Sequence, residues 1–178
     1  KGRGNAKTNF SLASFQLWGE RLHDSKDKES WERIFTPGSR LWHGLTSICD
    51  YIEYHGTGGG LSRPIFAEFL QEAGDALGDA SLVALSGRYS ELGRQWSDLA
   101  DAALPDEVPM MREAKALLAR KAELLNSAGP DAVDERQRVS ARREELAAEA
   151  AKKFPLDDVE CKALRAALQK RVLALYEG

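Results

Sequence analysis

Apolar residues recur at helical spacing along almost the whole chain, and no stretch shows the sustained alternation that marks a half-buried β-strand. Two of these stripes are long and strongly amphipathic. The first holds Leu41, Trp42, Leu45, Ile48, Cys49 and Ile52, and the second holds Ile65, Phe66, Phe69, Leu70, Ala73 and Leu77. Such stripes are typical of helices with one buried face. The 178 residues suffice for one domain of ordinary size. We therefore expect an all-α fold, an irregular helical bundle of about seven or eight helices.

Turn-forming and capping residues divide this pattern. A side-chain oxygen at a helix N-cap accepts a hydrogen bond from the first turn, and this predicts caps at Ser11, Ser39 and Asp79. Helices are expected to stop before the segment 36–38, because the residue before a proline avoids the helical region, and at the segment 78–79. The last helix is expected to begin at Asp157 or Asp158.

The composition changes near residue 109. Residues 1–108 hold most of the aromatic side chains and a glycine-rich loop, and we expect them to form a tightly packed helical core. Residues 109–178 are rich in Ala, Leu and charged residues, and we expect a helical extension that packs on this core within one domain. The extension holds a basic cluster interleaved with acids, Arg136, Arg138, Arg142 and Arg143, and two pairs at i,i+4 spacing, Asp134–Arg138 and Glu149–Lys153. This pattern indicates a solvated helix face.

Charge and hydropathy exclude several classes of function. The formal net charge is -3, so no electrostatic attraction to nucleic acid is expected. No apolar run approaches the roughly 18–20 residues that span a bilayer, and the basic N-terminus lacks the apolar segment of a signal peptide. The two cysteines are far apart and do not have metal-ligand spacing. We therefore expect a cytoplasmic protein that holds no metal and no cofactor.

A glycine-rich run, His-Gly-Thr-Gly-Gly-Gly-Leu-Ser-Arg-Pro over residues 55–64, separates the two apolar stripes. Its glycines allow positive φ angles and the close approach of another group. Ser62 and Pro64 are typical of a helix start, and such a start beside Arg63 is an anion-binding arrangement. The run is not a P-loop, because Leu and Ser follow the last glycine in place of Lys and Ser or Thr. It is not a dinucleotide fingerprint, because no strand precedes it.

Two interpretations of this loop remain open. It connects two helices, with Gly56 closing the first of them, or it faces a ligand or a partner. In the second case the ligand-binding residues are Gly56, Thr57, Gly58, Gly59, Gly60 and Arg63.

The sequence identifies no catalytic residue. Cys49 lies on an apolar stripe, where a buried thiol is inert, and Cys161 is expected to be less buried. His55 is expected to interact with the dipole of the helix that it ends; a general base or an anion ligand is the alternative.

Several motifs between residues 41 and 118 form a combined pattern. They are Gly56-Thr57-Gly58-Gly59-Gly60 with Arg63, the segment Phe-Ala-Glu-Phe-Leu-Gln-Glu-Ala at 66–73, Trp96, Leu99-Ala100 and the segment 103–106. This pattern resembles the C-terminal helical region of the butirosin-biosynthesis H protein family. One position differs, because Ser62 stands where that family has an aromatic residue, usually phenylalanine.

The resemblance implies a function. In that family an N-terminal domain similar to cysteine peptidases provides the nucleophile, and the founding member transfers an acyl group from an acyl carrier protein to an aminoglycoside amine. This chain is then expected to be the helical domain of a cysteine-dependent acyl- or peptidyl-transferase-like protein of secondary metabolism, inactive alone. It would shape the access of the substrate or acyl carrier, with a catalytic domain upstream. The alternative is a non-catalytic interaction module or homodimer whose Ala/Leu-rich C-terminal helices form the partner surface.

Overall fold

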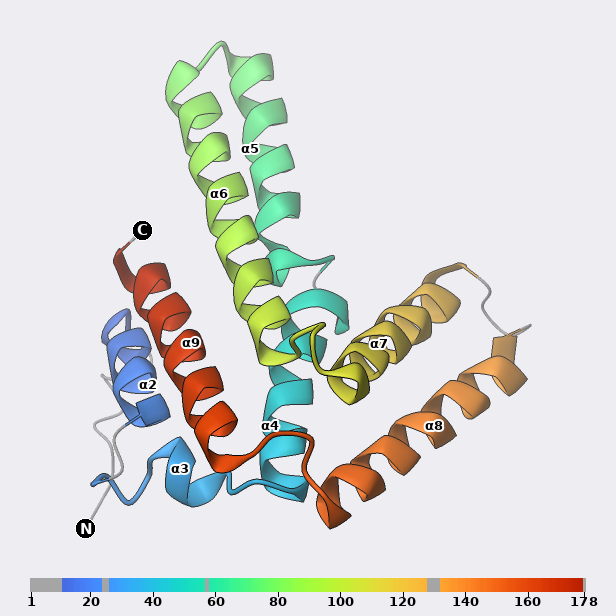
Figure 1. Ribbon diagram of the computed structural model, residues 1–178. Helices are drawn as coiled ribbons and strands as arrows, with labels where there is room; N and C mark the ends of the chain where they lie inside the picture. The colour runs from blue at the N-terminus through green and yellow to red at the C-terminus, as the bar shows by residue number, and fades with distance from the viewer. Residues whose placement is uncertain (1–10, 24–25, 57, 128–131, 178) are drawn as a thin grey trace.

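The computed structural model describes residues 11–23, 26–56, 58–127 and 132–177. In these residues eight α-helices and no strand are found (Figure 1), which confirms the expected all-α class and number of helices. The helices are α2 (Ala13–His23), α3 (Trp31–Ile34), α4 (Ser39–Cys49), α5 (Arg63–Leu77), α6 (Ala80–Ala103), α7 (Pro109–Ser127), α8 (Val133–Lys152) and α9 (Asp158–Glu177). A π-helical turn, η1 (Asp50–Tyr54), continues α4, and a 3₁₀ turn, η2 (Gly60–Ser62), precedes α5.

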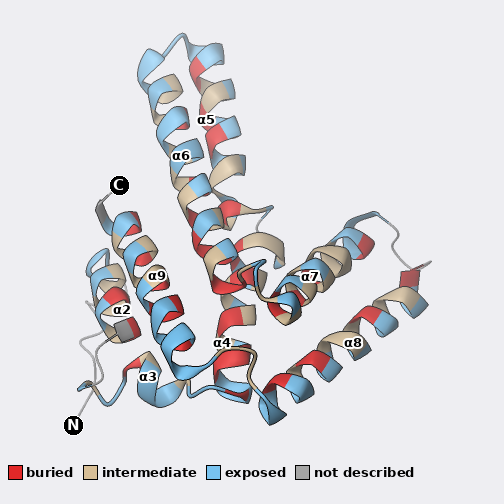
Figure 2. Ribbon diagram, viewed as in Figure 1, coloured by how far each residue is buried: buried red, intermediate tan, exposed pale blue. Residues whose placement is uncertain are grey.

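One hydrophobic core joins the two halves of the chain. Helix α4 packs against α6, α7 and α8, while α9 packs against α2 and α6. Buried residues gather where these helices face one another (Figure 2). The largest fully buried side chains come from both halves, and include Leu22, Leu41, Leu45, Leu99, Leu104, Met111, Leu118, Leu146, Leu168 and Val172. Burial of one leucine side chain stabilises a fold by about 1.5–3 kcal/mol, so this shared core ties the two halves together.

Helices α5 and α6 form an antiparallel hairpin that extends beyond the core (Figure 1). Ser86 Oγ of α6 donates a hydrogen bond of 2.8 Å to the Ala67 carbonyl of α5 and links the two helices at this position. Gly78, with φ +66°, ends α5. Asp79 then caps α6, because its carboxylate accepts a hydrogen bond of 2.8 Å from Ser81 N. The cap expected at Asp79 is therefore confirmed.

The N-termini of α9 and α4 are set by the residues that cap them. The last helix opens with a reciprocal capping box: Asp157 Oδ1 accepts from Glu160 N at 2.8 Å, and Glu160 Oε2 accepts from Asp157 N at 2.9 Å. The cap expected at Ser39 is wrong by one residue. Gly38 holds the N-cap position with φ +114°, a conformation open to glycine, and Ser39 is already helical.

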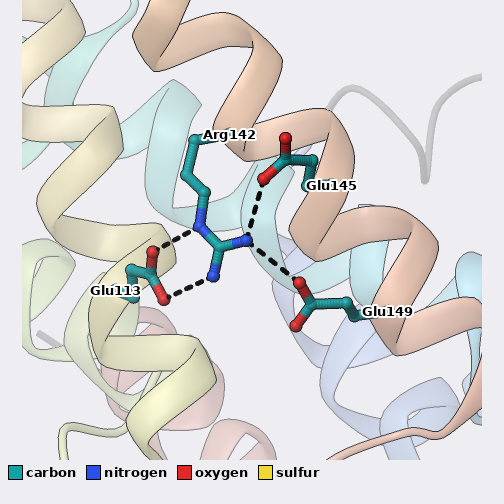
Figure 3. Close-up of polar contacts among 4 residues, drawn as sticks. All are labelled: Glu113, Arg142, Glu145 and Glu149. Atoms are coloured by element: carbon teal, nitrogen blue, oxygen red, sulfur yellow. Dashed lines mark hydrogen bonds and ion pairs between the residues drawn. The ribbon is translucent and has the colours of Figure 1, made fainter.

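The basic cluster on α8 contributes to helix packing. Arg142 Nε and Nη2 donate to the two carboxylate oxygens of Glu113 on α7, at 2.7 and 3.1 Å, and its Nη1 donates to Glu145 and Glu149, each at 3.0 Å (Figure 3). These hydrogen bonds lower the pKa of Glu113 and raise that of Arg142. Among the described residues neither expected i,i+4 pair forms. The expectation of a purely solvated face is corrected here, because Arg142 joins α8 to α7.

Candidate functional site

The glycine-rich loop has an unusual backbone conformation, which non-glycine residues rarely adopt. Five consecutive residues, Gly58 to Ser62, have positive φ angles between +50° and +84°. A left-handed conformation costs a non-glycine residue about 1–2 kcal/mol. Leu61 and Ser62 are therefore strained, and the contacts around them must offset this cost. Ser62 does occupy the N-cap position of α5, but at φ +65° its side chain makes no cap hydrogen bond, so the expected capping role is wrong.

Close packing against α6 explains why Gly60 is a glycine. A Cβ atom at this buried position would lie 2.8 Å from the carbonyl oxygen of Gly93 on α6. Gly93 in turn lies beneath Pro64, whose ring a Cβ at Gly93 would approach to 3.1 Å. On the other side of the turn, a Cβ at Gly58 would lie 2.6 Å from Ile65 Cδ1. The loop and α6 thus meet backbone to backbone, which sets where α5 begins.

An acidic side chain holds the same loop from η1. Glu53 Oε1 accepts a hydrogen bond of 3.3 Å from Gly60 N, and a Cβ at Gly59 would lie 3.3 Å from Glu53 Oε2. The chain's own carboxylate therefore takes one of the N–H groups available to an external anion. Gly56 has φ +72° in open space just after η1, which is the conformation expected of a residue that closes a helix. Thr57 lies outside the described residues.

Arg63 is partly buried at the end of the loop. Its Nη1 donates to the Leu61 carbonyl at 2.5 Å, and its guanidinium carbon lies 5.2 Å from the centroid of the Trp96 ring. Burial lowers the pKa of Arg63, but an arginine stays charged at neutral pH. In the part of the chain that the structure describes, no carboxylate pairs with this guanidinium.

An apolar groove of about 470 Å³ adjoins Leu61 and Trp96. Aromatic and aliphatic side chains from six elements line it, among them Trp18 of α2, Trp31 and Phe35 of the α3 region, and Ile48 of α4. The volume lies within the range of small-molecule sites. The aromatics were predicted to lie in the core, and they do pack against it as partly buried side chains, but the groove that they line was not predicted.

Leu70 of the α5 stripe is buried as predicted, but other members of the stripe are exposed, contrary to their predicted burial. Exposed fractions are 54% for Ile65, 41% for Phe66 and 58% for Phe69. Phe66 packs against Phe69 and, edge to face, against Tyr89 of α6. We call Ile65, Phe66 and Phe69 the apolar face of α5. Apart from the contact of Phe66 with Tyr89 and of Ile65 with the loop at Gly58, this face is largely exposed, because the hairpin extends beyond the core.

Neither cysteine is placed to act as a nucleophile. Cys49 is 1% exposed, which confirms its predicted place in the core, and burial raises its pKa to about 12. Cys161 is fully buried, so the expectation of lower burial is wrong; α9 turns it inward, with its Sγ 3.8 Å from the Leu156 carbonyl, and burial raises its pKa too. Such thiols stay protonated at neutral pH. His55 is exposed beyond η1, its ring 4.9 Å from that of Tyr51.

These features define an all-α domain with a strained loop, a partly buried arginine and an adjoining apolar groove. A family described as Domain of unknown function (DUF4872) matches residues 25–127. Because the match covers more than half of the chain, the protein belongs to this family. The matched segment runs through α3 to α7 and includes the loop and the hairpin.

Other comparisons add no relative. No curated protein and no solved structure matches the chain. Within the described ranges, no helix is long and apolar enough to cross a membrane. A search of the same residues finds no group of three or more His, Cys, Asp or Glu side chains that could hold a metal ion.

Proposed function

We propose that this chain is the helical domain of a cysteine-dependent acyl- or peptidyl-transferase-like protein of secondary metabolism. In this role it shapes the access of a substrate or acyl carrier to a catalytic site on a second domain. The observation that carries the proposal is the strained loop from Gly58 to Ser62 with Arg63 at its end. Backbone strain persists where surrounding structure over-determines it, and it clusters at functional sites. The resemblance of this loop and its flanking helices to the butirosin-biosynthesis H protein family supports the same function.

The burial of both thiols supports a proposal in which the nucleophile lies on a second domain. Acyl transfer of this kind needs a thiolate, and Cys49 and Cys161 are buried with raised pKa values. A catalytic domain upstream of Lys1 would supply the nucleophile, and an acyl carrier protein would deliver the acyl group as a thioester. We place this enzyme in the cytoplasm, where thiols stay reduced, with no nucleic acid or membrane as partner.

Arg63 is the residue proposed to meet the anionic part of the donor. The arm of an acyl carrier protein is attached through a phosphate, and a guanidinium binds phosphate with two parallel hydrogen bonds. Glu53 already accepts from Gly60 N, so the loop contributes mainly its shape and the small cross-section of Gly56, Gly58 and Gly59. Arg63 supplies the charge.

Binding of pantetheine 4′-phosphate, measured by isothermal titration calorimetry, tests this role. Arg63→Gln is expected to weaken binding by at least about fivefold, because a charge-assisted hydrogen bond to phosphate is lost. Arg94→Gln is the matched control, since Arg94 lies on the exposed side of α6 and pairs with Glu91. It should bind like the wild type. Equal affinity for wild type and Arg63→Gln would contradict the proposal, provided that circular dichroism shows both to be folded.

The apolar face of α5 favours a second candidate, a protein–protein interaction or dimerisation module. Among the described residues of the C-terminal helices expected to form the partner surface, the exposed large apolar side chains are Leu125 of α7, Val133 of α8, and Val159 and Tyr176 of α9. Ile65 and Phe69, by contrast, lie one turn apart on one helix. Sedimentation velocity of the wild type and of Phe69→Glu tests this candidate. A dimer that Phe69→Glu dissociates supports it, and a wild-type monomer at all concentrations contradicts it for self-association.

A further inference from the structure

The groove beside the loop has apolar walls. Trp31 and Phe35 pack ring on ring, with centroids 4.4 Å apart, and lie directly on α4 at Gly44, where a Cβ atom would be 3.0 Å from Phe35 Cδ1. Trp18 and Ile48 add further apolar surface. Among the described residues that line the groove there is no Asp, Glu, Lys or Arg side chain. Water in such a space is readily displaced by an apolar group.

A cationic side chain, Arg63, contacts two residues of the groove lining, although it does not line the groove itself. Trp96 and Leu61 line the groove, and the same two residues hold Arg63: the Trp96 ring lies 5.2 Å from the guanidinium carbon, and the Leu61 carbonyl accepts from Nη1 at 2.5 Å. A guanidinium has five N–H donors, and this carbonyl uses one of them. The remaining donors of Arg63, beside the Leu61 and Trp96 part of the groove, complement a negatively charged head group on an apolar body.

We propose that the groove binds an amphipathic anion, with a linear acyl tail between the aromatic side chains and a carboxylate-type head group at Arg63. The volume of about 470 Å³ suits such a molecule. It does not suit an α-helix of a partner protein, whose diameter with side chains is about 10–12 Å. This proposal rests on the proposed function in one respect: both assign an anionic group to Arg63.

Decanoate is the probe, compared with decan-1-ol and decyltrimethylammonium, which have the same tail with a neutral or a positive head group. Affinity is measured by calorimetry, and quenching of tryptophan fluorescence reports on the site because Trp18, Trp31 and Trp96 line it. Ser47 is exposed on α4 and lines the groove, so Ser47→Phe fills the groove without entering the core. Ser90→Phe, at an exposed serine of α6, is the matched control.

We expect one decanoate to bind per chain, with an affinity about tenfold higher than that of decan-1-ol. The affinity for decyltrimethylammonium should be lower than that for decan-1-ol. Arg63→Gln should remove this preference for the anion while the tail still binds. Ser47→Phe should weaken decanoate by about tenfold, through loss of space in the groove, and leave pantetheine 4′-phosphate binding unchanged. Ser90→Phe should bind every probe as the wild type does.

Three results would overturn the proposal: no binding of decanoate, equal affinity for the anionic and cationic probes, or unchanged decanoate affinity in a folded Ser47→Phe variant. Its failure is distinct from that of the proposed function. Decanoate binding without pantetheine 4′-phosphate binding would sustain the groove site and contradict the carrier-arm role of Arg63. The reverse result would sustain the carrier-arm role and contradict the groove site.

Discussion

Replacement of Gly60 by alanine tests the account of the loop, because two separate penalties meet at this residue. Its φ of +50° lies in the left-handed region, and its Cα faces the backbone of α6. A new Cβ would lie 2.8 Å from the Gly93 carbonyl oxygen and 3.0 Å from Gly93 Cα. These neighbours are backbone atoms of a long helix, so they cannot turn aside as a flexible side chain would.

The magnitude follows from three contributions. The left-handed backbone costs alanine about 1–2 kcal/mol. Overpacking against α6 adds about 1–3 kcal/mol. The smaller entropy of an unfolded chain without that glycine returns about 0.4–1 kcal/mol. Gly60→Ala should therefore lower the free energy of unfolding by about 1–4.5 kcal/mol, and the middle of this range, about 3 kcal/mol, is a large part of the stability of an ordinary domain.

Urea denaturation followed by far-UV circular dichroism measures this change, and two other glycines separate its causes. Gly56→Ala has the left-handed penalty alone, since φ is +72° and the space around it is open, and should cost about 1 kcal/mol. Gly87 lies within α6, exposed and in open space, so Gly87→Ala should stabilise the protein by about 0.5–1 kcal/mol.

The expected order of stability is Gly87→Ala, wild type, Gly56→Ala and Gly60→Ala, from highest to lowest. A Gly60→Ala variant as stable as Gly56→Ala would show that the loop does not lie against the backbone of α6. A Gly60→Ala variant as stable as the wild type would refute the left-handed turn as well.

Three further substitutions or conditions test other parts of the structure. Ser62→Gly should raise the free energy of unfolding by about 1 kcal/mol in urea denaturation, because it relieves a left-handed non-glycine residue, and a loss of stability would argue against that conformation. Iodoacetamide should label Cys49 far more slowly in the native protein than in urea, since burial raises its pKa to about 12, and equal rates measured by mass spectrometry would refute its burial. The pKa of Glu113 is lowered by Arg142, so its stabilising effect is present above the ordinary value of 4.5 and is lost as the pH falls through the folded-state pKa. Thermal unfolding of Glu113→Gln should therefore depend less steeply on pH in the acidic range than that of the wild type, and identical pH profiles would contradict the ion pair.

Helical periodicity was sufficient to predict the all-α fold class, because an apolar stripe at helical spacing can be buried on one face of a helix. The helix starts at Asp79 and Asp157 could also be predicted from the sequence, since their capping hydrogen bonds join residues only two or three positions apart. The same periodicity failed for the burial of Ile65 and Phe69. A stripe shows that a face is apolar, but it does not show whether the same chain or another molecule covers it.

The site was only partly predictable for a related reason. The glycines indicated positive φ angles, yet Leu61 and Ser62 share them. The close contact of Gly60 with Gly93 involves a helix distant in sequence, which no local pattern predicts. The hydrogen bond from Gly60 N to Glu53 likewise depends on the π-helical turn that places Glu53 beside the loop. The groove needs side chains from six elements at once, and no local pattern describes such an assembly.

We propose that this helical chain serves a cysteine-dependent transferase whose nucleophile lies outside it. The most direct test is mass spectrometry of the protein purified from its native source, intact and after brief iodoacetamide treatment. The account predicts a polypeptide much larger than the 19.6 kDa of this chain, in which one rapidly labelled cysteine lies N-terminal to Lys1. A native mass of 19.6 kDa, or rapid labelling of Cys49 or Cys161, would contradict it.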